Sequence, residues 1–187
     1  MYIKRNNELD IINLYLGDYR REFYLREISR LSKIPLKTTQ NFLSNLEKKG
    51  IIRGAVRGKN RYFQLNLDNI QTKFCLLESE IRKTILFLDK YPLFKTFLKD
   101  VKVEDMLVVF GSFAKSKADK DSDLDLLKAG GGNIPLHLLP YKVHKIGMSE
   151  NSFLKSMDEN LIKEVQEDHV ILNNHSLFVN SMWRHHG

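Results

Sequence analysis

Val109-Phe110-Gly111-Ser112, followed after ten residues by Asp123-Leu124-Asp125, is the stretch that decides the fold of the C-terminal half. Residues 106–110 are all apolar, and a short run rich in branched side chains predicts a buried strand. Gly111 and Ser112 then turn the chain into a helix expected from Phe113. A second strand is expected from Asp123, because apolar and polar side chains alternate there. Leu124 and Leu126 would point into the core.

The alternation places Asp123 and Asp125 on the same face of that strand, about 6–7 Å apart. Two carboxylates so close repel each other unless a cation lies between them, and Mg²⁺ prefers such hard oxygen ligands together with substrate phosphates. A helix that begins at a glycine turn offers free N–H groups to an anion. Ser112 adds a hydroxyl and Lys115 a positive charge. The pattern predicts a site for a metal ion and a triphosphate.

This strand, Gly-Ser, ten-residue, Asp-x-Asp pattern resembles the minimal nucleotidyltransferases of the DNA polymerase beta superfamily, over roughly residues 93–180. The resemblance implies a small mixed sheet flanked by helices. It implies that Gly111 and Ser112 bind nucleotide phosphates, and that Asp123 and Asp125 bind Mg²⁺ or Mn²⁺. The implied reaction transfers a nucleoside monophosphate from an NTP to an acceptor hydroxyl, and pyrophosphate leaves.

The sequence departs from that family at one point. Many members carry a third carboxylate on the next strand, where it activates the acceptor hydroxyl. The next strands expected here, over residues 135–139 and 141–146, contain no Asp or Glu. His144 is the candidate for that position, either as a general base or metal ligand, or only as a strand residue with a satisfied hydrogen bond. The glycine-rich residues 129–133 would form either a mobile flap or a sheet connection.

The first third of the chain predicts a different module. Apolar spacing predicts helices over residues 9–16, 24–32 and 36–49, with Pro35 at the start of the third. Period-two strands are expected over residues 51–53 and 61–66, joined by a basic hairpin. Fourteen Lys and Arg residues against seven Asp and Glu residues stand in residues 1–69, so the net charge of +7 lies wholly there. A basic module of this kind indicates a nucleic-acid partner or a solvated basic surface.

Three helices followed by a basic hairpin resemble the winged helix-turn-helix family, over nearly all of residues 5–68. The resemblance implies that the third helix enters the major groove of double-stranded DNA and that the hairpin contacts the backbone or minor groove. The alternative is a winged helix used only for protein contact. The implied DNA contacts are Lys37, Thr38, Thr39 and Gln40 on the helix, and Arg57, Lys59 and Arg61 on the hairpin.

Residues 70–91 contain no Gly or Pro and predict one long helix. Its apolar residues recur at intervals of three and four: Ile70, Phe74, Leu77, Ile81, Ile85 and Leu88. The stripe would pack under the flanking domains or against its copy in a homodimer. The chain is therefore expected to be α+β, with a winged helix at 1–69, a connecting helix at 70–92 and a nucleotidyltransferase-like domain at 93–187.

The composition of the 187 residues is that of a globular protein, with 42% hydrophobic and 28% charged residues. No apolar run approaches the roughly 20 residues of a membrane span, so no membrane partner is expected. Residues 1–7 lack the apolar core of a secretory signal. With Cys75 as the single cysteine no internal disulfide can form, and a cytoplasmic location is expected.

Three functions remain open. The first is a Mg²⁺-dependent nucleotidyltransferase carried on a DNA-binding winged helix. The second is a transcriptional regulator whose transferase-like domain only senses nucleotide. The third is an antitoxin-type transferase that modifies a partner protein, since small members of the superfamily share this Gly-Ser and Asp-x-Asp spacing. The missing carboxylate favours the second, whereas the intact Gly-Ser pair and aspartates favour the first and third.

Overall fold

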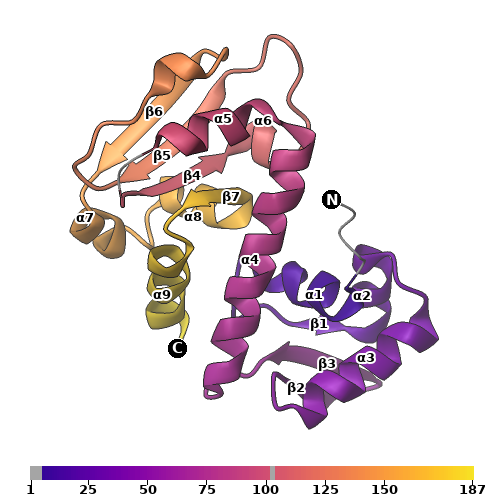
Figure 1. Ribbon diagram of the computed structural model, residues 1–187. Coiled ribbons are helices and arrows are strands. Elements are labelled where there is room, and N and C mark those ends of the chain that lie inside the picture. Colours follow the sequence, from indigo (N-terminus) through magenta and orange to yellow (C-terminus); the bar gives the residue numbers. More distant parts are fainter. Residues whose placement is uncertain (1–5, 102–103) are drawn as a thin grey trace. The chain divides into compact units, whose positions relative to one another are not determined.

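A computed structural model describes residues 6–101 and 104–187, and the fold is α+β as predicted (Figure 1). Of residues 1–7, which were considered for a secretory signal, residues 1–5 lie outside the described ranges. The chain divides into two compact units. Met1–Ser79 together with Met182–Gly187 form the N-terminal unit, and Glu80–Ser181 form the second unit. The division therefore runs within two helices, α4 and α9, whose bounds are given below.

The N-terminal unit combines helices with a three-stranded antiparallel sheet in the order β1-β3-β2. Buried side chains from every one of its elements up to β3 form its core, including Ile12, Tyr15, Phe23, Ile28 and Phe63. The Tyr15 hydroxyl donates a 3.0 Å hydrogen bond to the Phe63 carbonyl, which joins the first helical segment to the sheet. The elements are α1 (Asn7–Ile12), η1 (Asn13–Tyr15), β1 (Phe23–Tyr24), α2 (Leu25–Ser32), α3 (Leu36–Lys48), β2 (Ile52–Arg57) and β3 (Asn60–Leu65).

The hairpin of this unit is tighter than predicted. Strands β2 and β3 pair as far as Arg57 and Asn60, so only Gly58 and Lys59 form the turn. Gly58 has a φ of +60°, a conformation that a two-residue hairpin turn requires and glycine adopts easily. Arg57 consequently stands on a paired strand rather than in a loop, and Arg61 stands on the strand predicted for it.

The second unit contains a four-stranded mixed sheet in the order β6-β5-β4-β7. Strand β4 pairs antiparallel with both β5 and β7, whereas β5 and β6 are parallel. The strands are β4 (Met106–Phe110), β5 (Leu124–Ala129), β6 (Val143–Met148) and β7 (His169–Asn173). The helices are α4 (Ile70–Lys90, shared with the N-terminal unit), α5 (Leu93–Asp100), α6 (Gly111–Ala114), η2 (Leu136–Leu138), α7 (Glu150–Lys155), α8 (Asn160–Glu167) and α9 (His175–His186).

Both faces of this sheet are covered. On one face, Leu124 and Leu126 are fully buried as predicted, in a core that includes Phe94 and Phe97 of α5 and Phe113 of α6. Helices α7 and α8 lie on the other side (Figure 1). Because both faces are covered, β4 is buried at every position, as its unbroken apolar run predicts.

One segment differs from the prediction. Residues 135–139 were expected to form a strand, but they contain the short helix η2, and Leu139 is buried in the core. At the C-terminal end, α9 continues to His186, and its side chains at Phe178, Val179 and Met182 are buried.

Helix α4 buries a mixed polar and apolar face and exposes an apolar one. The buried residues are Thr72, Leu76, Ser79, Glu80, Thr84 and Phe87. The predicted stripe remains largely outside: Phe74 is 63% exposed, and Ile70, Ile81 and Ile85 are exposed as well. An exposed apolar stripe of this length on one helix is unusual, since apolar surface is normally buried.

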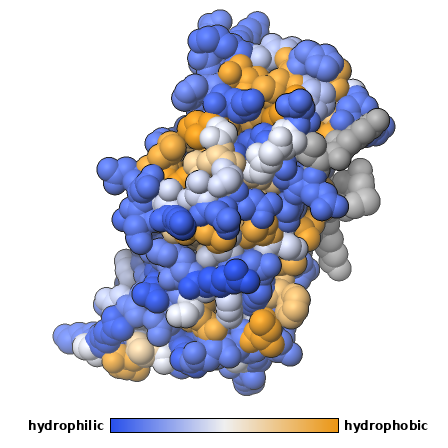
Figure 2. All heavy atoms as spheres, turned by 90° about the vertical axis from the view of Figure 1, so that its left-hand side faces the viewer, coloured by the Kyte–Doolittle hydropathy of each residue, from blue (hydrophilic) through white to orange (hydrophobic). Residues whose placement is uncertain are grey.

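Elsewhere the surface is ordinary for a globular chain. On the face drawn in Figure 2, hydrophobic surface is broken into several small patches separated by hydrophilic side chains. Among the residues that the structure describes, no helix combines the length and the hydropathy needed to cross a membrane.

Candidate functional site

Strand register brings the predicted site residues together. Phe110, the residue before the Gly-Ser pair, lies opposite Asp125, and Asp125 lies opposite His144. Directly opposed residues in a sheet point to the same face. His169 on β7 completes the row, because it lies opposite Phe110. The order across the sheet is therefore His144, Asp125, Phe110 and His169.

The Gly-Ser turn touches one of the two aspartates. Gly111 has a φ of +67°, in the left-handed region that glycine tolerates best. A Cβ atom at Gly111 would overlap the Asp125 carboxylate. Glycine is therefore favoured at this position by its backbone conformation, and a larger residue would also displace the Asp125 carboxylate from the turn.

Each aspartate has a partner near the start of β6, because Lys142 directly precedes this strand and His144 lies on it. The Lys142 Nζ donates to the Asp123 Oδ2 at 2.8 Å, and the His144 Nδ1 lies 3.4 Å from the Asp125 Oδ1. The hydrogen bond to Asp123 raises the pKa of Lys142 above its ordinary value. His144, the candidate for the third carboxylate's position, thus stands beside Asp125, with 68% of its side chain exposed. Exposure leaves its ring accessible to a substrate.

The predicted phosphate ligands Ser112 and Lys115 occupy α6 and its end. Helix α6 is a single turn, and the Lys115 N–H donates to the Gly111 carbonyl to close it. The Lys115 side chain extends toward the exposed carboxylate of Asp168, with 3.7 Å between Nζ and Oδ2. Lys115 is therefore held near the turn by an exposed ion pair with Asp168.

The segment between the two halves of the motif is shaped by its own hydrogen bonds. Ser122 donates from its hydroxyl to the Asp119 carboxylate at 2.8 Å, which lowers the pKa of Asp119. The Lys90 Nζ donates to the Ser116 carbonyl at 2.7 Å and ties the segment to α4. These bonds fix the ten-residue spacing as a compact loop rather than a free linker.

The glycine-rich segment lies at the opposite end of β5 from Asp123, so it does not flank the site. Asp105 holds it there: its carboxylate lies 2.7 Å from the Lys128 Nζ and accepts the Gly132 N–H at 2.8 Å. Gly130 has a φ of +137°, and a Cβ there would overlap Asp105. Of the two predicted alternatives, the segment is therefore a sheet connection held by Asp105, and not a flap beside the aspartates.

A buried ion pair supports the far end of the row. His169 and Glu80 are fully buried, and the His169 Nε2 lies 2.7 Å from the Glu80 Oε1. The other ring nitrogen, Nδ1, lies 2.8 Å from the Gln166 carbonyl and must donate to it, since a carbonyl oxygen can only accept. Burial raises the pKa of Glu80, but the charge and hydrogen bond of His169 outweigh it and leave that pKa below its ordinary value.

The donors present suit a substrate-bound magnesium ion better than a structural metal. Among residues 6–101 and 104–187, no group of three or more His, Cys, Asp and Glu side chains could hold a metal ion. Asp123 and Asp125 supply carboxylate oxygens, and Mg²⁺ commonly takes one or two of these and completes its shell with phosphates and water. The pair therefore fits a metal that arrives with a triphosphate.

The predicted DNA contacts lie in the N-terminal unit, and one of them is excluded. Thr39 is fully buried and its hydroxyl donates to the Ile34 carbonyl at 3.1 Å, so it cannot reach a groove. Its neighbours Lys37 and Gln40 are exposed, and Thr38 is half-buried. The reason is the helical period, which turns Thr39 toward the same side as Leu43 and Leu46.

The hairpin arginines are already ion-paired. Arg57 makes a two-pronged contact with the Glu22 carboxylate, with 2.7 Å between Nη2 and Oε1. Arg61 contacts Glu47 of α3 at 2.7 Å. Lys59 is exposed at the turn between them. The positive charge of the hairpin is thus partly compensated within the unit.

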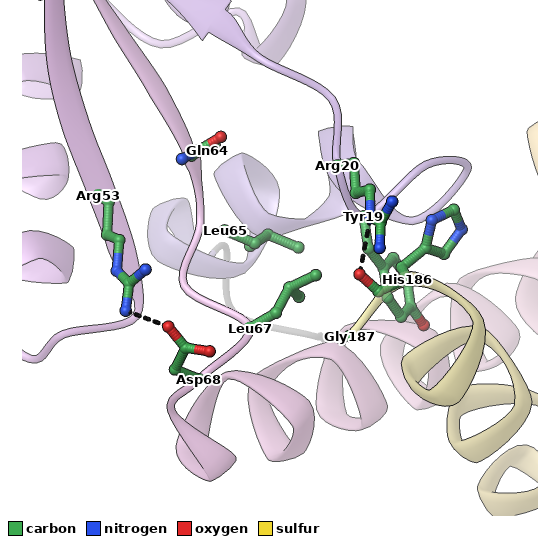
Figure 3. A pocket seen from close by; sticks show the side chains of 9 residues that line it. All are labelled: Tyr19, Arg20, Arg53, Gln64, Leu65, Leu67, Asp68, His186 and Gly187. Carbon is green, nitrogen blue, oxygen red and sulfur yellow. Dashed lines mark hydrogen bonds and ion pairs between the residues drawn. The ribbon is translucent and has the colours of Figure 1, made fainter.

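A separate pocket of about 330 Å³ lies in the N-terminal unit (Figure 3). The Arg20 Nε donates to the His186 carbonyl at 2.7 Å, and Arg53 contacts Asp68 at 2.6 Å. Both arginines on its rim are therefore occupied by acceptors from the chain itself. The remaining lining residues are Tyr19, Gln64, Leu65, Leu67 and Gly187.

With this geometry in view, residues 93–133 match the model of a known family, described as the nucleotidyltransferase domain. The matched range contains α5, β4, the Gly-Ser turn and both aspartates, and it ends before His144. Neither a curated protein nor a solved structure matches the chain.

The sequence prediction missed Lys142, Asp168 and the Glu80–His169 pair. A signal existed for the first, since Lys142-Val143-His144 has the same period of two as Asp123-Leu124-Asp125. In a parallel pair such segments lie side by side, and each aspartate then gains a partner. Asp168 and Glu80 gave no local signal, because their partners are distant in the sequence.

Proposed function

We propose that this chain is a Mg²⁺-dependent nucleotidyltransferase that moves a nucleoside monophosphate from an NTP to an acceptor hydroxyl. The observation that carries the proposal is the contact between Gly111 and Asp125, which joins the expected phosphate-binding turn to an expected metal ligand. The match of residues 93–133 to nucleotidyltransferase domains supports it.

The roles of the residues follow from their positions. The turn at Gly111 and Ser112, with Lys115 beside it, would hold the phosphates of the nucleotide. Asp123 and Asp125 would hold Mg²⁺ or Mn²⁺, which when bound neutralises charge on the phosphates. The acceptor oxygen would form a bond to the α-phosphorus, and the bond to pyrophosphate would break. His144 stands where a base could take the acceptor proton.

The direct test is incubation with labelled NTPs, Mg²⁺ and candidate acceptors, both proteins and nucleic acids. Transfer should fall about a hundred- to a thousandfold in Asp125→Asn, because losing one preorganised electrostatic group of this kind costs about 10²–10³. Asp121→Asn is the matched control: it removes the same charge from an exposed residue of the preceding loop. Equal loss in both variants would contradict the assigned role of Asp125.

The same experiment separates the alternatives. Transfer to a partner protein would support the antitoxin-type transferase. Mg²⁺-dependent NTP binding without transfer to any acceptor would support the nucleotide sensor, which the absence of a third carboxylate next to Asp125 favours. A failure to bind any NTP in the presence of Mg²⁺ would remove all three functions.

We propose further that the N-terminal unit binds double-stranded DNA, because the whole net charge of the chain lies in residues 1–69. Exposed Lys37 and Gln40 on α3, with Thr38 between them, would face the major groove, and Lys59, Arg57 and Arg61 would contact the backbone. Arg57 and Arg61 would first have to leave Glu22 and Glu47. Titration of a duplex at several salt concentrations tests this, since each phosphate contact contributes about 0.9 to the log–log slope.

The exposed stripe on α4 supports a homodimer as a third proposal. Phe74 and Ile81 lie on it, and both are exposed. Phe74→Glu should convert a dimer to a monomer in light scattering. The new carboxylate would be buried in the interface opposite the same residue of the second chain, at a cost of about 3–5 kcal/mol. Glu78→Gln on a neighbouring exposed turn is the control and should leave the mass unchanged. A wild-type monomer at all concentrations would exclude the dimer.

A further inference from the structure

The ion pair between Lys142 and Asp123 places a cation against an expected metal ligand. The Lys142 Nζ lies 2.8 Å from the Asp123 Oδ2, and the Leu124 N–H donates to the Lys142 carbonyl at 2.8 Å. The backbone bond fixes Lys142 beside Asp123, in continuation of the β5–β6 register that sets His144 beside Asp125. The position of Lys142 is therefore set by the sheet and not by the ion pair alone.

Lys142 is also free to move. Its side chain is 83% exposed, and β6 is an edge strand of the sheet. An exposed ion pair contributes little free energy, because water screens it and the long side chain loses freedom. A divalent cation would compete with the ammonium group for the same carboxylate. The ion pair between Lys142 and Asp123 can therefore break, and Asp123 can bind a metal ion instead, without disturbing the fold.

On the basis of the proposed function, we propose that Lys142 is a resident counter-ion of Asp123 that passes to the phosphates of the nucleotide when metal and NTP bind. Before loading, Lys142 relieves the repulsion between Asp123 and Asp125. After loading, its freed ammonium group would stand beside the carboxylates that hold the metal, where it would donate a charge-assisted hydrogen bond to a phosphate oxygen. Lys142 is thus a nucleotide-binding residue that the family match, ending at residue 133, does not contain.

The proposal predicts opposite effects on two measurements. In Lys142→Gln, Mn²⁺ alone should bind about two- to fivefold more tightly, because its competitor for Asp123 is gone and an exposed ion pair is weak. ATP with Mg²⁺ should bind about tenfold more weakly, because a charge-assisted hydrogen bond to phosphate is lost. Free Mn²⁺ can be followed by its electron paramagnetic resonance signal, and ATP binding by calorimetry.

Lys145→Gln is the matched control. Lys145 is exposed on β6, and alternation along this strand turns it to the opposite face from His144. The Lys145→Gln variant removes the same charge as Lys142→Gln, so any change that both variants share reflects net charge alone. Lys142→Arg should restore ATP binding and Mn²⁺ competition, since it keeps the cation.

The outcomes are distinguishable. Tighter Mn²⁺ and weaker ATP binding in Lys142→Gln, absent from Lys145→Gln, support the proposal. Unchanged or weaker Mn²⁺ binding in Lys142→Gln overturns it, and so does unchanged ATP binding. If the wild-type chain binds neither Mn²⁺ nor ATP, the proposed function itself fails, and the role of Lys142 fails with it.

Discussion

The expected nucleotide site and the expected DNA-binding hairpin position their charged residues in different ways. At the nucleotide site, backbone register puts Asp125 opposite Phe110, the residue before Gly111, and opposite His144. On the hairpin, Arg57 and Arg61 pair with carboxylates from other elements, Glu22 and Glu47. Strand pairing determines where the residues of a motif lie in the folded chain. A count of positive charges does not say which basic side chains are already ion-paired within the protein.

The largest effect on stability should come from the buried Glu80–His169 pair, at the end of the row formed by His144, Asp125, Phe110 and His169. His169→Leu leaves the Glu80 carboxylate buried without its partner, and this should lower the free energy of unfolding by about 3–5 kcal/mol. Glu47→Gln breaks a surface pair with Arg61 instead and should cost less than about 1 kcal/mol. Urea unfolding at neutral pH measures both. Equal losses of unfolding free energy in the two variants would show that the buried pair is no more stabilising than the surface pair.

The pH dependence of that loss has a definite sign. In the wild type the pKa of Glu80 lies below its ordinary value of 4.5, so the charged carboxylate stabilises the fold above pH 4.5 and this contribution is lost as pH falls through the lowered pKa. Without His169, burial alone would raise that pKa and make the charged form destabilising. The gap between wild type and His169→Leu should therefore shrink in acid, and a gap that widens below pH 4.5 would contradict this account.

A smaller effect is expected at the glycine turn. Gly111→Ala places a methyl group against the Asp125 carboxylate in a backbone conformation with φ +67°, and Mg²⁺-dependent NTP affinity should fall about a hundredfold. Gly131→Ala is the control, because a Cβ there meets nothing within 4 Å. Calorimetric titration with NTP measures both variants. Wild-type affinity in Gly111→Ala would show that the contact is dispensable.

The smallest effect should appear on the hairpin. Glu22→Gln releases Arg57, so the salt dependence of duplex binding should steepen by about 0.9 in log–log slope. Lys59→Ala should make it shallower by about the same amount. Glu27→Gln changes the net charge equally without freeing Arg57, and it serves as the control. If Glu22→Gln and Glu27→Gln behave alike, Arg57 is not a phosphate contact.

The success of prediction also differs between local and distant interactions. The strand over residues 106–110 and the helix over residues 70–91 were predicted closely, because the first is an unbroken apolar run and the second has apolar residues at helical spacing. Strand β1 was missed, since two residues carry no period and exist only by pairing with β3. The stripe on α4 was located correctly, but the face that packs inside contains Thr72, Glu80 and Thr84, whose partners lie elsewhere in the chain.

The sequence by itself determined the α+β class, the apolar strand before Gly111, and the period-two spacing that sets Asp123 and Asp125 apart from Leu124. These depend on local backbone geometry and on side chains near in the chain. Only the tertiary structure decided that Thr39 is buried, that His144 and Lys142 stand beside the aspartates, and that Glu80 meets His169. Such contacts join residues far apart in sequence, and they form because strand pairing sets Lys142 and His144 beside the aspartates and because buried polar groups such as Thr39 and Glu80 need hydrogen-bond partners.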